Sequence, residues 1–290
     1  MTDATADLKD WRFSIDREGI AWAIFDREGS SANALGRRPL QELETIVART
    51  EQGARDKTIA GLVIMSGKEK GFIVGADINE FEQFSSEDQV VDALRPVNAL
   101  LDRIERLSVP VVAAIHGVCV GGGLELVLAC HYRIATRDDG TRVGFPEVKL
   151  GIFPGFNGTA RSIRQAGPMA AMQAMLTGSM IRATSARGMG LIDELVPFKG
   201  NLRWAARKAV LQKRRSKPAG IAKAALGKWP ARGLLARKMR TETAKKVRED
   251  HYPAPYRLID LFEETGGDLE AMKKAETRAF APLMVSDASR

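Results

Sequence analysis

The chain has 290 residues, of which 44% are hydrophobic and 28% charged, with a formal net charge of +8. This composition excludes a disordered chain, because there is enough apolar surface to bury a core. Two cysteines are too few for a disulfide framework or a structural zinc site. No apolar run has the length of a membrane span, and residues 1–11 lack the apolar stretch of a secretion signal, so we expect a cytoplasmic protein.

Hydrophobic periodicity predicts the elements of the first third of the chain. Residues 11–26 alternate apolar and polar side chains around a turn at 17–19, which predicts a hairpin. Residues 39–49 have apolar side chains three and four apart and open with a proline, which predicts a helix. Residues 59–65 form an apolar run typical of a strand.

A longer amphipathic helix is predicted over residues 90–107, despite Pro96 within it. Its apolar side chains recur at spacings of three and four. We expect the charged residues between them to form a solvated face rather than a site. These are Asp102, Arg103, Glu105 and Arg106.

The central stretch, residues 109–131, combines a buried strand, a glycine turn and a buried helix. The β-branched run Val111–Ile115 is followed by Gly117, by the triple glycine 121–123 and by apolar residues without a breaker. One charge, Glu125, lies in the first turn of the helix, where free N–H groups favour an acid. By itself this pattern also fits a helix that begins with glycines for close packing.

Two further glycine-rich turns flank the central one. Residues 71–78 read Gly-Phe-Ile-Val-Gly-Ala-Asp-Ile, and a helix is expected to begin near Ile78. Residues 144–159 again set one acid, Glu147, among apolar residues, glycines and prolines, after a strand at 132–136. Alone, Glu147 also fits a loop acid that caps a neighbour.

Together the three turns resemble the crotonase (enoyl-CoA hydratase/isomerase) superfamily, and within it the hydratase part of the multifunctional fatty-acid oxidation α-subunits. The resemblance covers residues 13–197 and three motifs in the same order. They are Gly75-Ala76-Asp77-Ile78, Gly121-Gly122-Gly123-Leu124-Glu125, and Pro146-Glu147 with Leu150-Gly151-Ile152-Phe153-Pro154-Gly155.

The resemblance implies an α/β fold, a crotonase-like spiral of repeated ββα units with a C-terminal helical extension. We expect the hydratase core in residues 1–199 and a basic helical extension in residues 200–290. Residues 279–283 resemble the linker that precedes a dehydrogenase domain in the multifunctional subunits, and no Gly-x-Gly-x-x-Gly follows a strand. We therefore expect a hydratase portion without its dehydrogenase domain.

The same resemblance implies the residues of a hydratase site. An enoyl thioester that takes up water must place negative charge on its carbonyl oxygen, which two fixed N–H groups can stabilise. The resemblance assigns these groups to Ala76 and Gly122. It assigns the proton donor to carbon to Glu147 and the activation of water to Glu125. Coenzyme A arrives with the substrate, and neither a metal nor another cofactor is expected.

The turn at residues 74–79 is expected to meet coenzyme A. Backbone groups of this turn are predicted to contact the adenine and pantetheine. Lys68 and Lys70, just before it, are the candidates for the phosphates. The expected contact residues are Val74, Gly75, Asp77, Ile78 and Asn79.

Asn157 departs from the family pattern Pro-Gly-x-Gly-Gly. Asparagine tolerates positive φ better than other non-glycine residues, so we expect the turn to survive with a narrower or more polar acyl pocket. The histidines carry no predicted chemistry. A structural role is expected for His116, and neither His131 nor His251 has an evident partner for binding a metal.

Two functions from different classes remain open at this stage. The first is enoyl-CoA hydration in fatty-acid β-oxidation, with Δ3-Δ2 enoyl-CoA isomerase activity as an addition. The second is RNA binding on a hydratase fold, which the bases in residues 199–248 suggest. Nucleic acid is the less favoured partner, because only Trp204 and Trp229 accompany those bases. The protein partner is expected to be another copy of the chain or a thiolase subunit.

Overall fold

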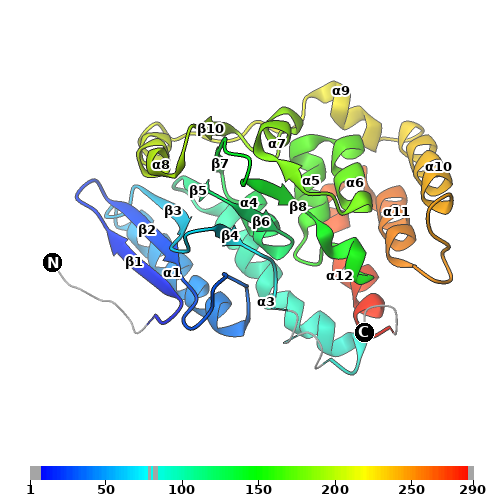
Figure 1. The fold of residues 1–290 in the computed structure, drawn as a ribbon, viewed down its shortest axis with the longest axis horizontal. Helices are drawn as coiled ribbons and strands as arrows, with labels where there is room; N and C mark the ends of the chain where they lie inside the picture. The colour runs from blue at the N-terminus through cyan, green and yellow to red at the C-terminus, as the bar shows by residue number, and fades with distance from the viewer. Residues whose placement is uncertain (1–7, 78–79, 81–83, 287–290) are drawn as a thin grey trace.

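The computed structural model describes residues 8–77, 80 and 84–286, and its strands form two sheets (Figure 1). The larger sheet has the order β1-β2-β3-β5-β7-β10, with only the β1–β2 pair antiparallel. Its strands are β1 (Trp11–Ile15), β2 (Ile20–Phe25), β3 (Gly61–Ser66), β5 (Val111–Ile115), β7 (Tyr132–Thr136) and β10 (Glu194–Val196). The smaller sheet contains, in order, β4 (Gly71–Ile73), β6 (Val118–Val120), β8 (Arg142–Gly144) and β9 (Ile181–Arg182).

Three consecutive repeats each place one strand in the larger sheet, one strand in the smaller sheet and then a helix. β3 and β4 precede α3 (Glu87–Arg106), β5 and β6 precede α4 (Gly122–Ala129), and β7 and β8 precede α5 (Gly158–Ala166). This order confirms the predicted spiral of ββα units. Strand β6 was not predicted, because its three residues lie between two glycine turns and are too few to show a period.

Both faces of the larger sheet are buried, as its continuous apolar strands require. α1 (Arg37–Arg55) and α3 lie on the main core, whereas α8 (Leu202–Leu211) covers the other face. Small and branched side chains of α8 contact strand residues of that face, including Trp22 and Val112. α8 lies beyond the expected domain boundary near Gly200 but packs on the sheet as a layer of the core. The chain after Gly200 therefore does not separate from the core at that residue.

The other helices complete the molecule, and the last one returns to the centre. α12 packs against α3, α5 and α11 (Figure 1). The two glycines at 266 and 267 separate α11 from α12. The helices are α6 (Pro168–Thr177), α7 (Ala183–Met189), α9 (Ile221–Ala224), α10 (Ala231–Ala244), α11 (Ala254–Thr265) and α12 (Leu269–Met284), with 3-10 turns η1 (Pro146–Leu150), η2 (Lys199–Asn201) and η3 (Ala225–Gly227). None of the helices in the described residues is long and apolar enough to cross a membrane.

The expectation that the charged residues of α3 form a solvated face was wrong for Asp102 and Glu105. Arg161 of α5 is fully buried, and its guanidinium lies 2.7 Å from Asp102 Oδ1 and 3.3 Å from Glu105 Oε2. The Lys273 ammonium of α12 lies 3.1 and 2.9 Å from the same two oxygens. Burial opposes ionisation, but the charges of Arg161, Arg164 and Lys273 lower the pKa of Glu105 to about 2. The acids of α3 therefore join three helices, because α5 and α12 close over them.

Candidate active site

The turn between β6 and α4 presents free backbone amides. Gly121 has φ of 55°, a left-handed value that favours glycine, and its N–H donates to Gly144 O of β8 at 3.0 Å. Gly122 is the first residue of α4, so its N–H has no partner one turn earlier in the helix. The strand-to-helix turn predicted at residues 121–123 is confirmed.

The amide of Ala76 lies beside that of Gly122. Leu35 and Ala76 form a parallel bridge in which Leu35 N donates to Gly75 O and Asp77 N donates to Leu35 O. In such a bridge the N–H of Ala76 points away from Leu35. A Cβ added to Gly122 would lie 3.4 Å from Ala76 N. The two predicted donors therefore meet in one small space.

Glu125 is held by the N-terminal turn of α5. Its side chain is buried, and Oε1 accepts the N–H of Phe156 at 2.8 Å and that of Gly158 at 2.9 Å. Burial raises the pKa of Glu125 to about 7, while these two N–H groups and Arg161 act against the shift. The carboxyl group can therefore exchange a proton near neutral pH.

Asn157 aims both of those N–H groups at one oxygen. Its φ of 60° and ψ of 28° are left-handed, which confirms the expectation that this asparagine supports a positive φ in the turn. The reversal of the chain at Asn157 lets Phe156 and Gly158 face the same carboxyl oxygen.

Glu147 lies opposite, in the first turn of η1. It is 8% exposed, and within the described residues neither of its carboxyl oxygens has a hydrogen-bond partner. A Cβ added to Gly121 would lie 3.3 Å from Glu147 Oε1, so this carboxyl adjoins the glycine turn. Burial and then the charge of Glu125 raise the pKa of Glu147 well above its usual range. Two buried carboxyls with different environments thus lie beside the two amides.

A cavity of about 660 Å³ adjoins these groups, a size typical of small-molecule sites. Phe156 lines it and also lies against the amide turn, since a Cβ on Gly122 would come within 2.8 Å of its ring. Most of the other lining side chains are apolar, and most belong to α1 and α3. This cavity is the candidate for the acyl chain.

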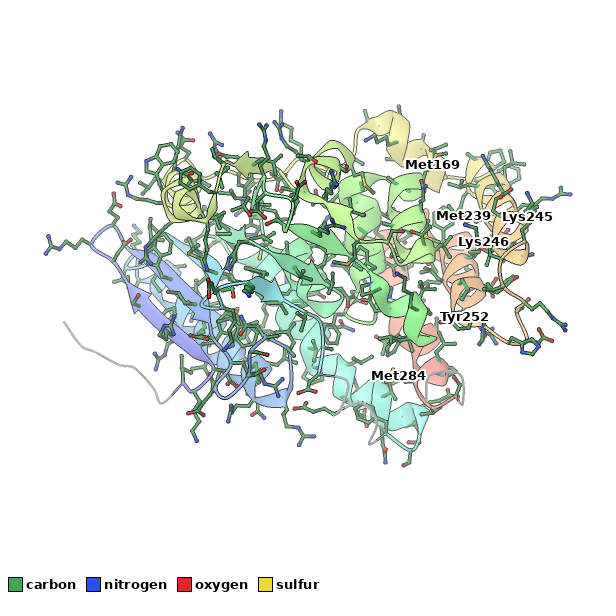
Figure 2. The ribbon with its side chains drawn as sticks, viewed as in Figure 1. Met169, Met239, Lys245, Lys246, Tyr252 and Met284 are labelled. Atoms are coloured by element: carbon green, nitrogen blue, oxygen red, sulfur yellow. The ribbon has the colours of Figure 1, made fainter. Side chains whose placement is uncertain are left out.

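Two other cavities are lined by neither of the two acids. One of about 740 Å³ is lined by bases that include Arg187 and Arg214. The other, of about 640 Å³, lies between η1, α6, α10 and α11, with Met169, Met239 and Tyr252 in its wall (Figure 2). Neither is lined by the amides of Ala76 and Gly122, so neither is the candidate for the acyl chain.

The turn predicted to meet coenzyme A makes some of its polar contacts with other residues of the chain. The N–H of Val74 donates to Asn33 O at 2.9 Å, and the Asp77 carboxyl accepts from the guanidinium of Arg27 at 2.6 Å. The side chain of Val74 is 44% exposed, so this edge of the turn faces solvent. Ile78 and Asn79 lie outside the described residues.

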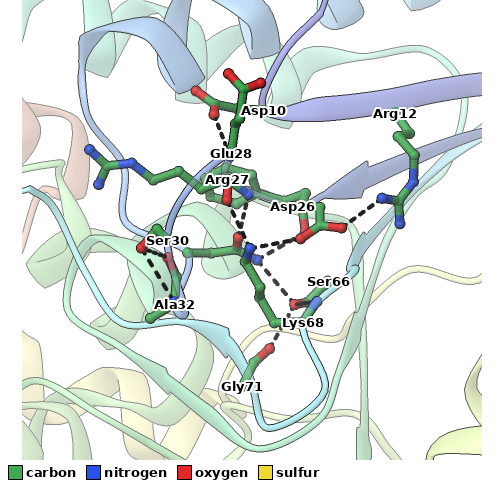
Figure 3. A network of polar contacts seen from close by, with 12 residues as sticks. Asp10, Arg12, Asp26, Arg27, Glu28, Ser30, Ala32, Ser66, Lys68 and Gly71 are labelled. Atoms are coloured by element: carbon green, nitrogen blue, oxygen red, sulfur yellow. Dashed lines mark hydrogen bonds and ion pairs between the residues drawn. The ribbon is translucent and has the colours of Figure 1, made fainter.

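Lys68 has partners of its own (Figure 3). Its ammonium lies 2.8 Å from Asp26 Oδ1 and donates to Arg27 O at 2.8 Å. A lysine fixed in this way is a poorer phosphate contact than the sequence predicted, whereas Lys70 is exposed. The hydrogen bond from Lys68 instead holds the backbone at Arg27, whose guanidinium pairs with Asp77.

His116, His131 and the two cysteines fill structural positions, whereas His251 is exposed. His116 Nε2 lies 2.8 Å from Lys68 O, and His131 Nδ1 accepts the Val111 N–H at 3.0 Å. Cys119 and Cys130 are buried free thiols. In the described residues no group of three or more side chains could hold a metal ion.

Sequence reasoning missed Glu276 and Arg161. Both are buried at 0% exposure. A signal for Glu276 was present, because Met272, Glu276, Phe280 and Leu283 recur at spacings of three and four. An acid among apolar residues at these spacings is buried when that face of the helix packs against the core.

The match to a family model covers most of the chain. The enoyl-CoA hydratase/isomerase model matches residues 17–230. The chain belongs to the enoyl-CoA hydratase/isomerase family. The fatty acid oxidation complex subunit alpha of Shewanella sp. (strain MR-4) is 36% identical over 278 residues, which are 94% of this chain and 38% of that relative. The chain thus spans less than half the length of this relative.

Solved structures of the family share the fold. An enoyl-CoA hydratase from Bacillus anthracis matches with a TM-score of 0.64 and 26% identity, covering 90% of this chain and 91% of that chain. A carnitinyl-CoA dehydratase from Mycobacterium thermoresistibile matches with a TM-score of 0.72 and 20% identity, covering 97% and 87%. These matches confirm the predicted crotonase fold over nearly the whole chain, including much of the segment after Gly200.

Proposed function

We propose that this chain adds water to 2-trans-enoyl-CoA thioesters to give 3-hydroxyacyl-CoA. The observation that carries the proposal is the pair of buried carboxyls, Glu125 and Glu147, beside the adjacent amides of Ala76 and Gly122. Membership of a hydratase/isomerase family supports the reaction class.

In this mechanism the thioester carbonyl oxygen accepts hydrogen bonds from the N–H groups of Ala76 and Gly122. When water adds to the β-carbon, electrons move through the double bond to this oxygen, and both donors stabilise the enolate. Because the donors are backbone groups, they are already oriented before the charge develops. The positive end of α4 adds to the effect.

The two carboxyl groups carry out different proton transfers. Glu125 is ionised more easily, since two N–H groups and Arg161 favour its charged form, and it takes a proton from water. Glu147 keeps its proton, since burial and the charge of Glu125 oppose ionisation, and it delivers that proton to the α-carbon. The pair carries one negative charge before and after the step. No step requires a metal or another cofactor.

The setting of the reaction follows from the relatives. The relative from Shewanella is named as a subunit of a fatty acid oxidation complex, so we assign this chain to fatty-acid β-oxidation, with acyl-CoA as substrate. A thiolase subunit or another copy of this chain is the protein partner in this proposal.

The test is hydration of crotonyl-CoA by the purified chain, followed by the loss of the conjugated thioester absorbance. Glu147→Gln, which keeps the shape of the side chain, is the negative control. A 3-enoyl-CoA substrate tests the isomerase addition, because moving a proton between two carbons needs Glu147 and the amides but no water. A chain that is folded but hydrates no enoyl-CoA would refute the proposal.

The nucleic-acid alternative loses support from the contacts of its bases. Within the described residues, several bases of the segment 199–248 are paired inside the chain: Arg207 with Glu18, Arg214 with Glu194, Arg240 with Asp260 and Glu263, Lys245 with Glu242, and Arg248 with Asp250. The charges of these five bases are therefore already matched within the chain. RNA binding that persists at physiological salt would restore this alternative.

A further inference from the structure

A buried asparagine near the amide turn uses its whole side chain for hydrogen bonds. Asn33 lies between β2 and α1 and is 1% exposed. Its Oδ1 accepts the N–H of Arg27 at 2.9 Å. Its Nδ2 donates to Phe25 O at 2.9 Å, and to Ser66 Oγ and Phe72 O at 3.0 Å each. A buried carboxamide with these partners holds its surroundings in one arrangement, because its loss would leave several polar groups unpaired.

The acceptors of the Asn33 amide lie at the ends of strands. Phe25 ends β2 and Ser66 ends β3, and the two are register partners in the larger sheet. Phe72 belongs to β4 of the smaller sheet. The Ser66 hydroxyl also donates to Gly71 O at 2.6 Å, which joins β3 to the start of β4 (Figure 3). The Asn33 side chain therefore connects the two sheets just before the turn that follows β4.

The main chain of the same segment is paired with that turn. The N–H of Val74 donates to Asn33 O at 2.9 Å. Two residues further along, the N–H of Leu35 donates to Gly75 O at 2.9 Å. The C=O of Gly75 and the N–H of Ala76 belong to one planar trans peptide group, so they point in opposite directions. The hydrogen bond from Leu35 thus sets the direction of the Ala76 N–H.

Asn33 supports the turn by a second route, through Arg27. Asn33 Oδ1 holds the N–H of Arg27, whose guanidinium lies 2.6 Å from Asp77 Oδ2. Because Asp77 directly follows Ala76, the turn is held on both sides of this amide. Gly75, with φ of 122°, adds little stiffness of its own. The direction of the Ala76 N–H therefore depends on contacts from outside the turn.

The other groups of the site are held without Asn33. Gly122 begins α4, and the N–H of Gly121 before it donates to Gly144 O of β8 at 3.0 Å. Glu125 takes its hydrogen bonds from the N-terminal turn of α5. A change at Asn33 should therefore displace one amide and leave the second amide and the carboxyl groups in place.

We propose that Asn33 is a positioning residue for the Ala76 amide, a carboxamide that ties the ends of three strands together and so aims this N–H at the thioester carbonyl oxygen. The inference rests on the proposed function for its kinetic test. A hydrogen bond to the developing enolate weakens steeply when its donor points away. Asn33 acts on the reaction through Leu35 and Arg27, since its own polar atoms are bonded to the protein.

The experiment removes the carboxamide in Asn33→Ala. In the intact chain, kcat for crotonyl-CoA hydration is expected to fall about 100-fold, the cost of misplacing a group of the site by about 1 Å, with KM little changed. Bound cinnamoyl-CoA reports the polarisation of the carbonyl. In a Glu147→Gln background, its absorbance should lie at shorter wavelength when Asn33→Ala is added, because a weaker hydrogen bond polarises the conjugated carbonyl less. A purely structural role would lower stability and leave both readouts unchanged in the folded protein.

Amide signals give a readout without substrate. In protein labelled with nitrogen-15 at alanine and glycine, the Ala76 signal should move in Asn33→Ala while the Gly122 signal stays. Thr50→Ala is the matched control, because Thr50 is 0% exposed and its hydroxyl donates to Ile46 O within α1 at 2.8 Å. This control should lose stability but keep kcat and both signals.

If Asn33→Ala fails to fold, Asn33→Ser keeps a hydroxyl in the same space and gives the same test. An unmoved Ala76 signal in either folded variant overturns the inference, whatever the rate. A displaced Ala76 signal with an unchanged kcat overturns it as well, because the amide would then not serve the reaction. A parent chain that hydrates nothing would instead overturn the proposed function, while the Ala76 signal still decides whether Asn33 positions this amide.

Discussion

Glu125 and Gly158 lie 33 positions apart in the chain, yet the backbone N–H of Gly158 donates to the Glu125 carboxyl at 2.9 Å. The contact joins the first turn of α4 to the first turn of α5. A Cβ at position 158 would lie 2.5 Å from the Glu125 oxygen, so only glycine permits this approach without rearrangement. The orientation of the acid thus depends on the chain path through residues 155–158.

Replacing either acid by glutamine should separate chemistry from binding. In Glu125→Gln and in Glu147→Gln, kcat for crotonyl-CoA hydration is expected to fall at least about 100-fold with KM little changed, because proton transfer is lost and shape is kept. The double variant should lose much less than the product of the two losses. Isomerisation needs no water, so Glu125→Gln should spare it more than Glu147→Gln does. Steady-state kinetics measures each effect.

The exposed Glu264→Gln on α11 is the control for these variants and should behave as the parent. Hydration by Glu147→Gln within a few-fold of the parent would remove Glu147 from its assigned role.

The acid limb of kcat/KM should reflect Glu125. The pKa of Glu125 is about 7 because the group is buried, and the base must be ionised to accept a proton. The rate is therefore expected to be full above this pH and to fall about tenfold per unit below it. A rate that stays level down to about pH 5 would show that another group is the base.

Gly122→Ala should disable the amide pair. The new Cβ would lie 2.8 Å from the Phe156 ring and 3.4 Å from Ala76 N, so the ring or the turn must move. Loss of one such donor costs about 100- to 1000-fold in kcat. Gly188→Ala on α7 is the control, since nothing lies within 4 Å of a Cβ there. Equal activity of the two variants would contradict the assignment of the Gly122 amide.

Asn157 should tolerate glycine better than alanine. Its left-handed φ of 60° costs a residue with a Cβ about 1–2 kcal/mol, which glycine avoids. Asn157→Gly is expected to keep hydration near the parent level. Asn157→Ala is expected to lower both the unfolding free energy and kcat, because Gly158 no longer points its N–H correctly at Glu125. Thermal unfolding and kinetics check both, and equal behaviour would show that backbone conformation is not the constraint.

Glu105→Gln should destabilise the protein in a pH-dependent way. Breaking a buried ion pair leaves Arg161 undercompensated and costs about 3 kcal/mol at neutral pH. The folded pKa of Glu105 is about 2 against an ordinary 4.5, so its stabilisation is full above pH 4.5 and lost as the pH falls towards 2. Urea unfolding of the parent and the variant should therefore converge near pH 2.

The matched control for Glu105 is the exposed pair of Glu242 and Lys245. Glu242→Gln should change stability little at any pH, because solvent screens such pairs. A constant difference between the parent and Glu105→Gln at all pH values would assign the loss to packing instead of charge.

The sequence by itself determined the order of the elements and the local form of each turn. The β-branched run Val111–Ile115, the glycines at 121–123 and the single acid Glu125 predict a strand, a turn and a helix with an acid in its first turn, because these signals act over a few residues. The tolerance of Asn157 for positive φ is likewise local. These features are present in the structure because the fold is compatible with the local backbone preferences of these residues.

Only the tertiary structure decided which distant groups share one buried space. The amide of Ala76 meets that of Gly122 because β4 and β6 pair, and Glu276 is buried because α12 returns against α5. Periodicity marks Glu276 as facing a core, but it does not say which residues form that core. The charges of Asp102 and Glu105 were misjudged for the same reason, since whether a helix face meets water depends on what packs over it.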